Sequence, residues 1–148
     1  MADVTAIRTW LSEDPLDVTQ VIAEASSIEA GGIGIFIGTV RASASVESNS
    51  IKSVVRLDYE AHPTLAIEKL QAAAEAAAAK FELIKIAAVH RTGRCELGEP
   101  TVAIACAAAH RGEALDAARF LIDEIKATVP IWKSEVYGDG SAWVGATP

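Results

Sequence analysis

The sequence has little that would indicate a disulfide framework or a membrane environment. Its two cysteines, Cys95 and Cys106, are too few for a disulfide-stabilised scaffold, and each is expected to be a small buried residue in a reducing compartment. No apolar run reaches the roughly 18 residues that a membrane span needs, and the N-terminus has no signal-peptide pattern. We therefore expect a cytoplasmic protein with no membrane partner.

Basic residues are also scarce. The chain has 13 Lys and Arg residues against 20 Asp and Glu residues, a net charge of −7, which argues against nucleic acid as a partner. Because the chain as a whole is negatively charged, any site that binds an anion must be a small cluster of basic residues. The three histidines lack metal-ligand spacing, and the chain contains no P-loop, GxGxxG after a strand, HExxH or GxSxG motif. We expect neither a metal nor a cofactor.

What the chain does have is enough apolar sequence for one folded domain over residues 1–148. Hydrophobic residues make up 51% and charged residues 22% of the sequence, which are ordinary globular values. A chain of this length buries about 68% of its unfolded surface and can hold a pocket without disulfides.

Local patterns predict an alternation of strands and helices. Period-2 or continuous apolar patterns predict strands before Asp14 and over residues 31–41, 53–61, 83–89, 101–109, 131–137 and 141–144. Helical spacing predicts helices over residues 18–26, 64–81 and 112–129, the last ending at Pro130. Residues 42–50 and 92–100 are expected to be loops. The order predicts a two-layer α+β domain with two long helices over a largely antiparallel sheet.

Glycines punctuate the strand over residues 31–41. Gly34 and Gly38 share one face of that strand with Phe36 and Val40. Because glycine lacks a side chain, another backbone or a ligand is expected to approach closely there.

Three basic clusters lie at the ends of predicted strands, namely Arg41, His90-Arg91 and His110-Arg111. Arginine binds phosphate or carboxylate well, and the start of a helix after His110-Arg111 would add backbone N–H donors to an anion site. The structural alternative is that each arginine pairs with a nearby acid, such as Glu96, Glu99 or Glu113.

Two lysines are candidates for proton transfer. Lys126 lies on the boundary of the apolar stripe of its helix, where partial burial would ease loss of a proton. Lys133 follows the rigid Pro130-Ile131-Trp132 segment. The alternatives are that Lys126 extends to solvent at a helix C-terminus and that Lys133 pairs with Glu135.

Ordered fragments along the chain resemble one known family. They are Gly38-Thr39-Val40-Arg41, Leu57-Asp58-Tyr59-Glu60-Ala61, His90-Arg91-Thr92-Gly93, Gly98-Glu99, His110-Arg111, Lys126, Pro130-Ile131-Trp132-Lys133-Ser134-Glu135, Asp139-Gly140 and Trp143-Val144. Each fragment is weak alone, but the ordered set is similar to the catalytic (large) subunit of molybdopterin synthase. The resemblance extends from about Leu16 to Val144.

The resemblance implies a fold, a reaction and partners. It implies an α/β-hammerhead type of domain that forms a homodimer, with one small ubiquitin-like sulfur carrier at each end of a heterotetramer. The carrier brings sulfur as a C-terminal Gly-Gly thiocarboxylate. Two sulfurs convert cyclic pyranopterin monophosphate to molybdopterin, so the implied enzyme is a sulfurtransferase of molybdenum cofactor biosynthesis.

The resemblance also implies a set of site residues. Lys126 and Lys133 are the implied catalytic residues, each able to act as general acid/base or to stabilise developing charge. Both also belong to the implied substrate-binding set, which comprises Thr39, Val40, Arg41, His110, Arg111, Lys126, Lys133, Ser134 and Glu135.

Two other classes of function compete with this interpretation. A non-catalytic anion-binding or assembly module of the same fold predicts substitution at Lys126 or Lys133, yet both lysines are present. A phosphate-ester enzyme with His110 as general base requires a nucleophile or metal partner, which the sequence does not indicate.

Overall fold

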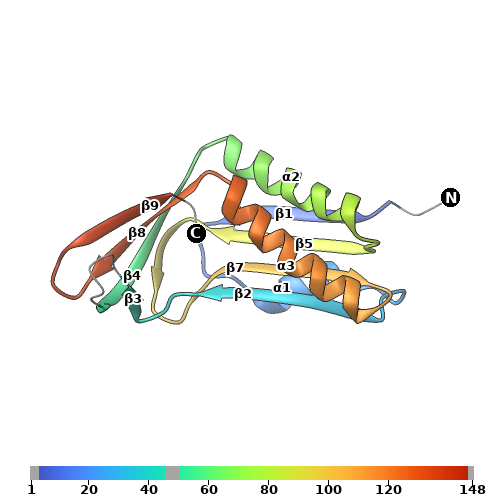
Figure 1. Ribbon diagram of the computed structural model, residues 1–148, viewed down its shortest axis with the longest axis horizontal. Helices are drawn as coiled ribbons and strands as arrows, with labels where there is room; N and C mark the ends of the chain where they lie inside the picture. The colour runs from blue at the N-terminus through green and yellow to red at the C-terminus, as the bar shows by residue number, and fades with distance from the viewer. Residues whose placement is uncertain (1–3, 46–50, 147–148) are drawn as a thin grey trace.

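The computed structural model describes residues 4–45 and 51–146, which form two β-sheets arranged along the long axis of the molecule (Figure 1). The first sheet contains, in spatial order, β1 (Ala6–Ser12), β5 (Lys85–Arg91), β7 (Pro100–Ala108) and β2 (Gly32–Thr39). The second contains β3 (Ser43–Ser45), β4 (Ile51–Ala61), β8 (Ile131–Tyr137) and β9 (Ala142–Ala146), with β6 (Gly93–Glu96) also paired to β4.

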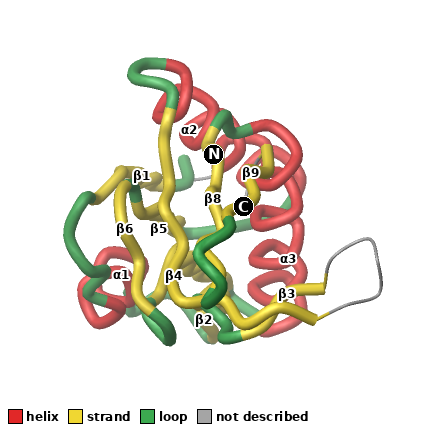
Figure 2. Tube along the Cα trace, turned by 90° about the vertical axis from the view of Figure 1, so that its left-hand side faces the viewer, coloured by secondary structure: helices red, strands yellow, loops and turns green. Residues whose placement is uncertain are grey.

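Helices cover both faces of the first sheet. The long helices α2 (Leu65–Lys80) and α3 (Arg111–Thr128) pack on one face, and the short helix α1 (Val18–Ala25) packs on the other (Figure 2). Among the described strand pairs only β1 and β5 run parallel. The predicted α+β class, with two long helices and largely antiparallel pairing, is confirmed.

Small side chains allow the layers to approach closely. Every residue of β7 from Thr101 to Ala108 is buried, and five of these eight are alanine or cysteine. On α2, the buried face contains Ala66, Ala73, Ala74 and Ala77, each exposed by 3% or less. Alanine loses no side-chain entropy on burial and also favours the helix. The alanine-rich sequence of α2 therefore both forms a helix and allows close packing on the sheet.

Pro130 redirects the chain from the first sheet to the second. Helix α3 ends where the Val129 N–H donates to the Ile125 carbonyl at 3.0 Å, and β8 begins at Ile131. The β8–β9 hairpin then reverses through a turn in which Gly140 has a φ of +86°, a conformation that favours glycine. Lys126 lies in the last turn of α3, just before Pro130, and Lys133 lies on β8, just after it.

Two predicted loops contain short strands. Residues 42–50 include β3, and residues 92–100 include β6, and both strands pair with the long strand β4. The prediction was wrong because neither strand has an apolar alternation of its own. Both strands are held by hydrogen bonds to β4, from the neighbouring part of the chain for β3 and from a distant part for β6. Residues 46–50 of the first predicted loop lie outside the described residues.

A β-bulge alters which valine of β4 is buried. The alternation of the sequence placed Val55 on the same face as Leu57 and Tyr59. The pairing of β4 with β8 shifts between Val54 and Arg56, so that Val54 is only 4% exposed and Val55 is 42% exposed. The extra residue of a bulge exchanges the faces on either side of it.

At Gly34 the backbones of α3 and β2 are in close contact. A Cβ atom at this position would lie 2.1 Å from the carbonyl oxygen of Ala114. The close backbone approach expected at the glycine face is therefore confirmed at Gly34, and the approaching backbone is that of α3.

Gly34→Ala should destabilise the protein by about 1 to 3 kcal/mol, because the methyl group would force α3 away from β2. A suitable control is Gly112→Ala near the start of α3, where an added Cβ would meet nothing within 4 Å. That control should be neutral or stabilising, since alanine is the better helix former. Urea unfolding of both variants measures the difference, and equal stability of the two would contradict the packing argument.

Candidate active site

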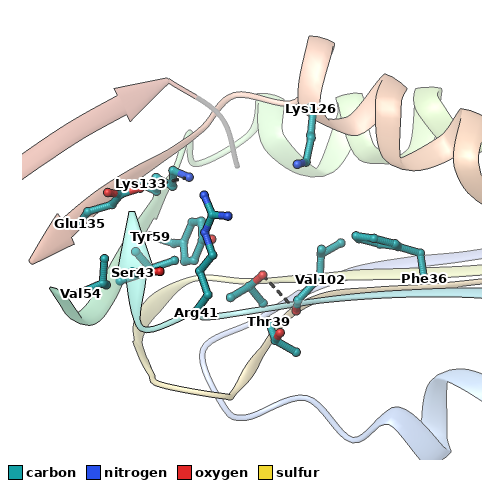
Figure 3. Close-up of a pocket in the computed structure, with 13 residues that line it drawn as sticks. Phe36, Thr39, Arg41, Ser43, Val54, Tyr59, Val102, Lys126, Lys133 and Glu135 are labelled. Carbon is teal, nitrogen blue, oxygen red and sulfur yellow. Dashed lines mark hydrogen bonds and ion pairs between the residues drawn. The ribbon is translucent and has the colours of Figure 1, made fainter. Parts of the chain in front are cut away.

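A cavity of about 300 Å³ lies where the two sheets and the C-terminal end of α3 meet (Figure 3). Strands from both sheets contribute to its wall, and Lys126 reaches it from α3. Its lining comprises Phe36, Gly38, Thr39, Arg41, Ser43, Val54, Leu57, Tyr59, Thr101, Val102, Lys126, Lys133 and Glu135. Five of the nine residues in the predicted set therefore line one cavity.

The pairing of β4 with β8 orients one wall of the cavity. Leu57 is opposite Glu135, and Tyr59 is opposite Lys133. Because side chains alternate along a strand, all four residues lie on the same face of the second sheet. Lys133 Nζ lies 3.5 Å from Glu135 Oε1, so the predicted alternative pairing of these residues is present within the cavity itself.

Positive charge is concentrated at this cavity. Its lining contains three cationic side chains, Arg41, Lys126 and Lys133, but only one carboxylate, that of Glu135. The charged ends of the three cations point into the same space (Figure 3). In a chain of net charge −7 this cluster is a local concentration of positive charge, which makes the cavity a candidate anion site.

Tyr59 adds a neutral hydrogen-bonding group to the wall. Burial raises the pKa of Tyr59 to about 12, although a hydrogen bond with Thr101 opposes the effect. The phenol therefore keeps its proton at neutral pH. Thr101 Oγ1 in turn donates to the Gly38 carbonyl at 3.3 Å. The sequence assigned Tyr59 no role, although its place beside Leu57 in the strand alternation was a usable signal.

The His90-Arg91 cluster lies in the interior, away from the cavity lining. Arg91 Nη1 donates to Glu99 Oε2 at 3.0 Å, and Nη2 donates to the Glu13 and Arg94 carbonyls at 3.2 and 2.7 Å. For this cluster the structural alternative, pairing with a nearby acid, is confirmed. Arg91 thus joins β5 to the loop before β7.

His90 supports the cavity wall from behind. Its ring packs edge-on against Tyr59, with ring centroids 5.0 Å apart. His90 Nδ1 lies 2.7 Å from the Arg91 carbonyl, which can only accept, so this nitrogen carries the proton. Burial lowers the pKa of His90 to about 4, and the hydrogen bond to the Arg91 carbonyl opposes the effect.

The structure does not bring His110 and Arg111 to the cavity of their own chain. They lie at the N-terminal end of α3, whereas Lys126 lies in its last turn. At 1.5 Å per residue, Arg111 and Lys126 are about 22 Å apart along the helix. Both His110 and Arg111 are exposed.

Two other members of the predicted set do not line the cavity. Val40 is 3% exposed and belongs to the core, where its N–H donates to the Glu99 carbonyl at 3.1 Å. Ser134 is paired with Asp58 and lies on the face of β8 opposite to Lys133 and Glu135. On β8, strand alternation separates Ser134 from Lys133 and Glu135, which do line the cavity.

The composition also leads us to expect buried cysteines, no metal site and no membrane-spanning segment. Cys95 and Cys106 are buried and free, as predicted, and burial raises the pKa of Cys106 to about 12. Among residues 4–45 and 51–146 no group of three or more His, Cys, Asp or Glu side chains could hold a metal ion. In the same part of the chain, no helix is both long and apolar enough to cross a membrane.

Comparison with known proteins identifies close relatives. Residues 11–128 match the family described as MoaE protein. The chain is 42% identical over 152 residues to molybdopterin synthase catalytic subunit 1 of Mycobacterium tuberculosis, and 100% of both chains is covered.

Solved structures agree with these sequence relatives. The fold is similar to molybdopterin synthase from Staphylococcus aureus, with a TM-score of 0.80, 26% identity and 99% of both chains covered. It is also similar to a chain in the protein–protein complex of subunits 1 and 2 of molybdopterin-converting factor from Helicobacter pylori. That match has a TM-score of 0.64 and 20% identity, and covers 93% of this chain and 87% of the other.

Stability should fall as the pH is lowered from 6.5 towards 4, because His90 takes up a proton in the unfolded chain before it does so in the folded protein. The loss attributable to His90 is about 3 kcal/mol across this range. Above pH 6.5 the contribution is constant. His90→Gln should show a shallower pH dependence in urea unfolding. An unchanged slope would mean that His90 is not the group responsible.

Proposed function

Because this chain belongs to the MoaE protein family of molybdopterin synthase catalytic subunits, we propose that it is a sulfurtransferase of molybdenum cofactor biosynthesis. The sulfur donor is the C-terminal Gly-Gly thiocarboxylate of a small ubiquitin-like carrier. The acceptor is cyclic pyranopterin monophosphate, which receives two sulfurs and becomes molybdopterin. The observation that carries the proposal is the convergence of Arg41, Lys126 and Lys133 on one cavity.

Each cation has a role that suits its chemistry. The planar guanidinium of Arg41 suits the phosphate of the pterin, which it can bind through two parallel hydrogen bonds. Lys126 and Lys133 approach from α3 and from β8, so they can contact a bound substrate from two directions. Either amine can transfer a proton or stabilise negative charge that develops during sulfur transfer.

The sulfur nucleophile arrives on the partner protein, so no cysteine of this chain has to act. Cys106 is fully buried and its thiol resists ionisation, which makes it a poor nucleophile. The extended Gly-Gly tail of the carrier is narrow enough to enter the cavity, where Gly38 adds no side chain to the wall. The Helicobacter pylori complex of two subunits supports a small-subunit partner of this kind.

The distance between Lys126 and Arg111 supports a homodimer in which each cavity uses residues of both copies. Strand β2 is an edge of the first sheet and exposes Ile35, Phe36 and Ile37 beside the exposed Leu115 of α3. Such an apolar edge strand, which among the described strands pairs only with β7, is suited to a second copy.

A two-fold axis at the middle of β2 would place the two β2 strands antiparallel. Gly32, at one end of β2, adjoins Arg111, whereas Thr39, at the other end, lines the cavity. Antiparallel pairing sets these ends against each other. His110 and Arg111 of each copy would then lie beside the cavity of the other, and one carrier at each end would complete a heterotetramer.

Lys126→Ala should lower turnover by about 10² to 10⁴-fold while pterin and carrier affinities change little, since an acid/base group acts mainly in the transition state. Lys126→Arg should lower turnover as well, because a guanidinium does not release its proton near neutral pH. Lys69→Ala, on the exposed side of α2, is the matched control. Single-turnover formation of the dithiolene from thiocarboxylated carrier is the measurement, and a wild-type rate for Lys126→Ala would exclude this role.

Mixed dimers test whether the site is shared between copies. We expect the Lys126→Ala homodimer and the Arg111→Ala homodimer both to be impaired. A purified heterodimer with one variant on each chain should regain activity, because one of its two cavities then contains Lys126 and the partner's Arg111 intact. If both residues served the same chain's cavity, neither cavity would be intact and the heterodimer would stay impaired.

A further inference from the structure

Tyr137 contacts the charged pair of the cavity without lining the cavity. Its hydroxyl donates to Glu135 Oε2 at 2.9 Å, and Glu135 Oε1 lies 3.5 Å from Lys133 Nζ. The three residues are spaced by two along β8 and therefore lie on one face of the strand. They form a chain of contacts from the interior to the cavity.

The far end of this chain is held firmly. Tyr137 is only 4% exposed, and its backbone is paired with Val54 of β4. Its N–H donates to the Ser141 carbonyl at 2.9 Å, and its carbonyl accepts from the Gly140 N–H at 3.1 Å, so the hairpin turn holds it from the other side. The phenol is thus a rigid donor with a set position.

The exposed fractions fall from the cavity inwards. The Lys133 side chain is 26% exposed, and that of Glu135 is 12% exposed. A lysine has four rotatable side-chain bonds and a compact charge, so without a partner it samples many positions. A carboxylate can rotate as well. With Oε2 bound by the phenol, Oε1 is left facing the lysine.

We propose that Tyr137 is a positioning residue, whose hydroxyl orients Glu135 so that this carboxylate holds the Lys133 amine in the cavity. The proposal rests on the proposed sulfurtransferase function, which gives Lys133 a reason to be held. Burial, aided by the hydrogen bond to Glu135 and its charge, raises the pKa of Tyr137. The phenol therefore remains a donor across the neutral range.

The ion pair between Lys133 and Glu135 also neutralises the only carboxylate among the described residues of the cavity lining. Arg41 and Lys126 remain available for the anionic substrate, because Glu135 Oε1 is directed at Lys133. Loss of the Tyr137 hydroxyl should therefore disturb the orientation of Lys133 more than the attraction for substrate. The expected signature is a lower kcat with KM nearly unchanged.

Tyr137→Phe removes the hydroxyl and retains the ring. We expect kcat to fall about tenfold, the scale of one hydrogen bond to a charged group, while KM for the pterin changes less than about twofold. In a Glu135→Gln background the same substitution should have little further effect, because both act through one contact chain. Additive losses in this double-mutant cycle would mean that Tyr137 has only a structural role and would overturn the proposal.

A second measurement does not depend on synthase activity. The folded protein is treated with a trace of an acetylating reagent, and the acetylation of Lys133 relative to Lys126 is measured by mass spectrometry. In Tyr137→Phe the ratio should rise by about two- to fivefold, the change that corresponds to loss of a surface ion pair. An unchanged ratio would overturn the positioning role.

The two measurements separate this proposal from the proposed function. If wild-type protein and thiocarboxylated carrier yield no dithiolene, the sulfurtransferase function fails, and the acetylation ratio still decides the role of Tyr137. If turnover is present but both kcat and the ratio are unchanged in Tyr137→Phe, only the positioning role fails. Thermal unfolding of each variant shows that the protein tested is folded.

Discussion

The backbone contact between α3 and β2 at Gly34 determines where the rest of the site lies. With no Cβ at Gly34, the Ala114 carbonyl approaches the strand directly, and from there α3 runs obliquely across the first sheet (Figure 1). The last turn of the helix then lies over the cavity, which places Lys126 there. Pro130 ends the helix at this point and sends the chain into β8, which brings Lys133 back to the same cavity.

The second sheet supplies the polar wall, and its order depends on β4. This strand pairs with β8 along most of its length and also with β3 and β6, so it ties three separate parts of the chain together. Burying charged groups is costly unless they are paired, and the Lys133–Glu135 pair meets that demand at the sheet surface. Arg91 meets it in the interior through Glu99 and two carbonyls.

Much of the fold and part of the site were predictable from local patterns. Helical spacing and strand alternation depend only on neighbours in sequence, so the three helices and the long strands were identified. Arg41, Lys126 and Lys133, which were singled out from their places on these elements, line one cavity. The strand β6, the bulge after Val54 and the burial of Val40 depend on pairings that are distant in sequence, and β3, which pairs with the start of β4, has no apolar alternation of its own. No local pattern encodes such pairings.

The position of His110 and Arg111 is the most instructive difference between sequence and structure. A family resemblance indicates which residues belong to one site, but it does not say which copy of the chain supplies each of them. The length of α3 adds that information, because a helix is rigid and cannot bring its two ends together. If His110, Arg111 and Lys126 serve one substrate, the chain has to associate with a second copy, and the exposed apolar edge of β2 lies between the two ends of that helix. The same contact at Gly34 that places Lys126 over its own cavity also holds Arg111 beside the far end of β2, which is where the proposed pairing of two copies along that edge would need it.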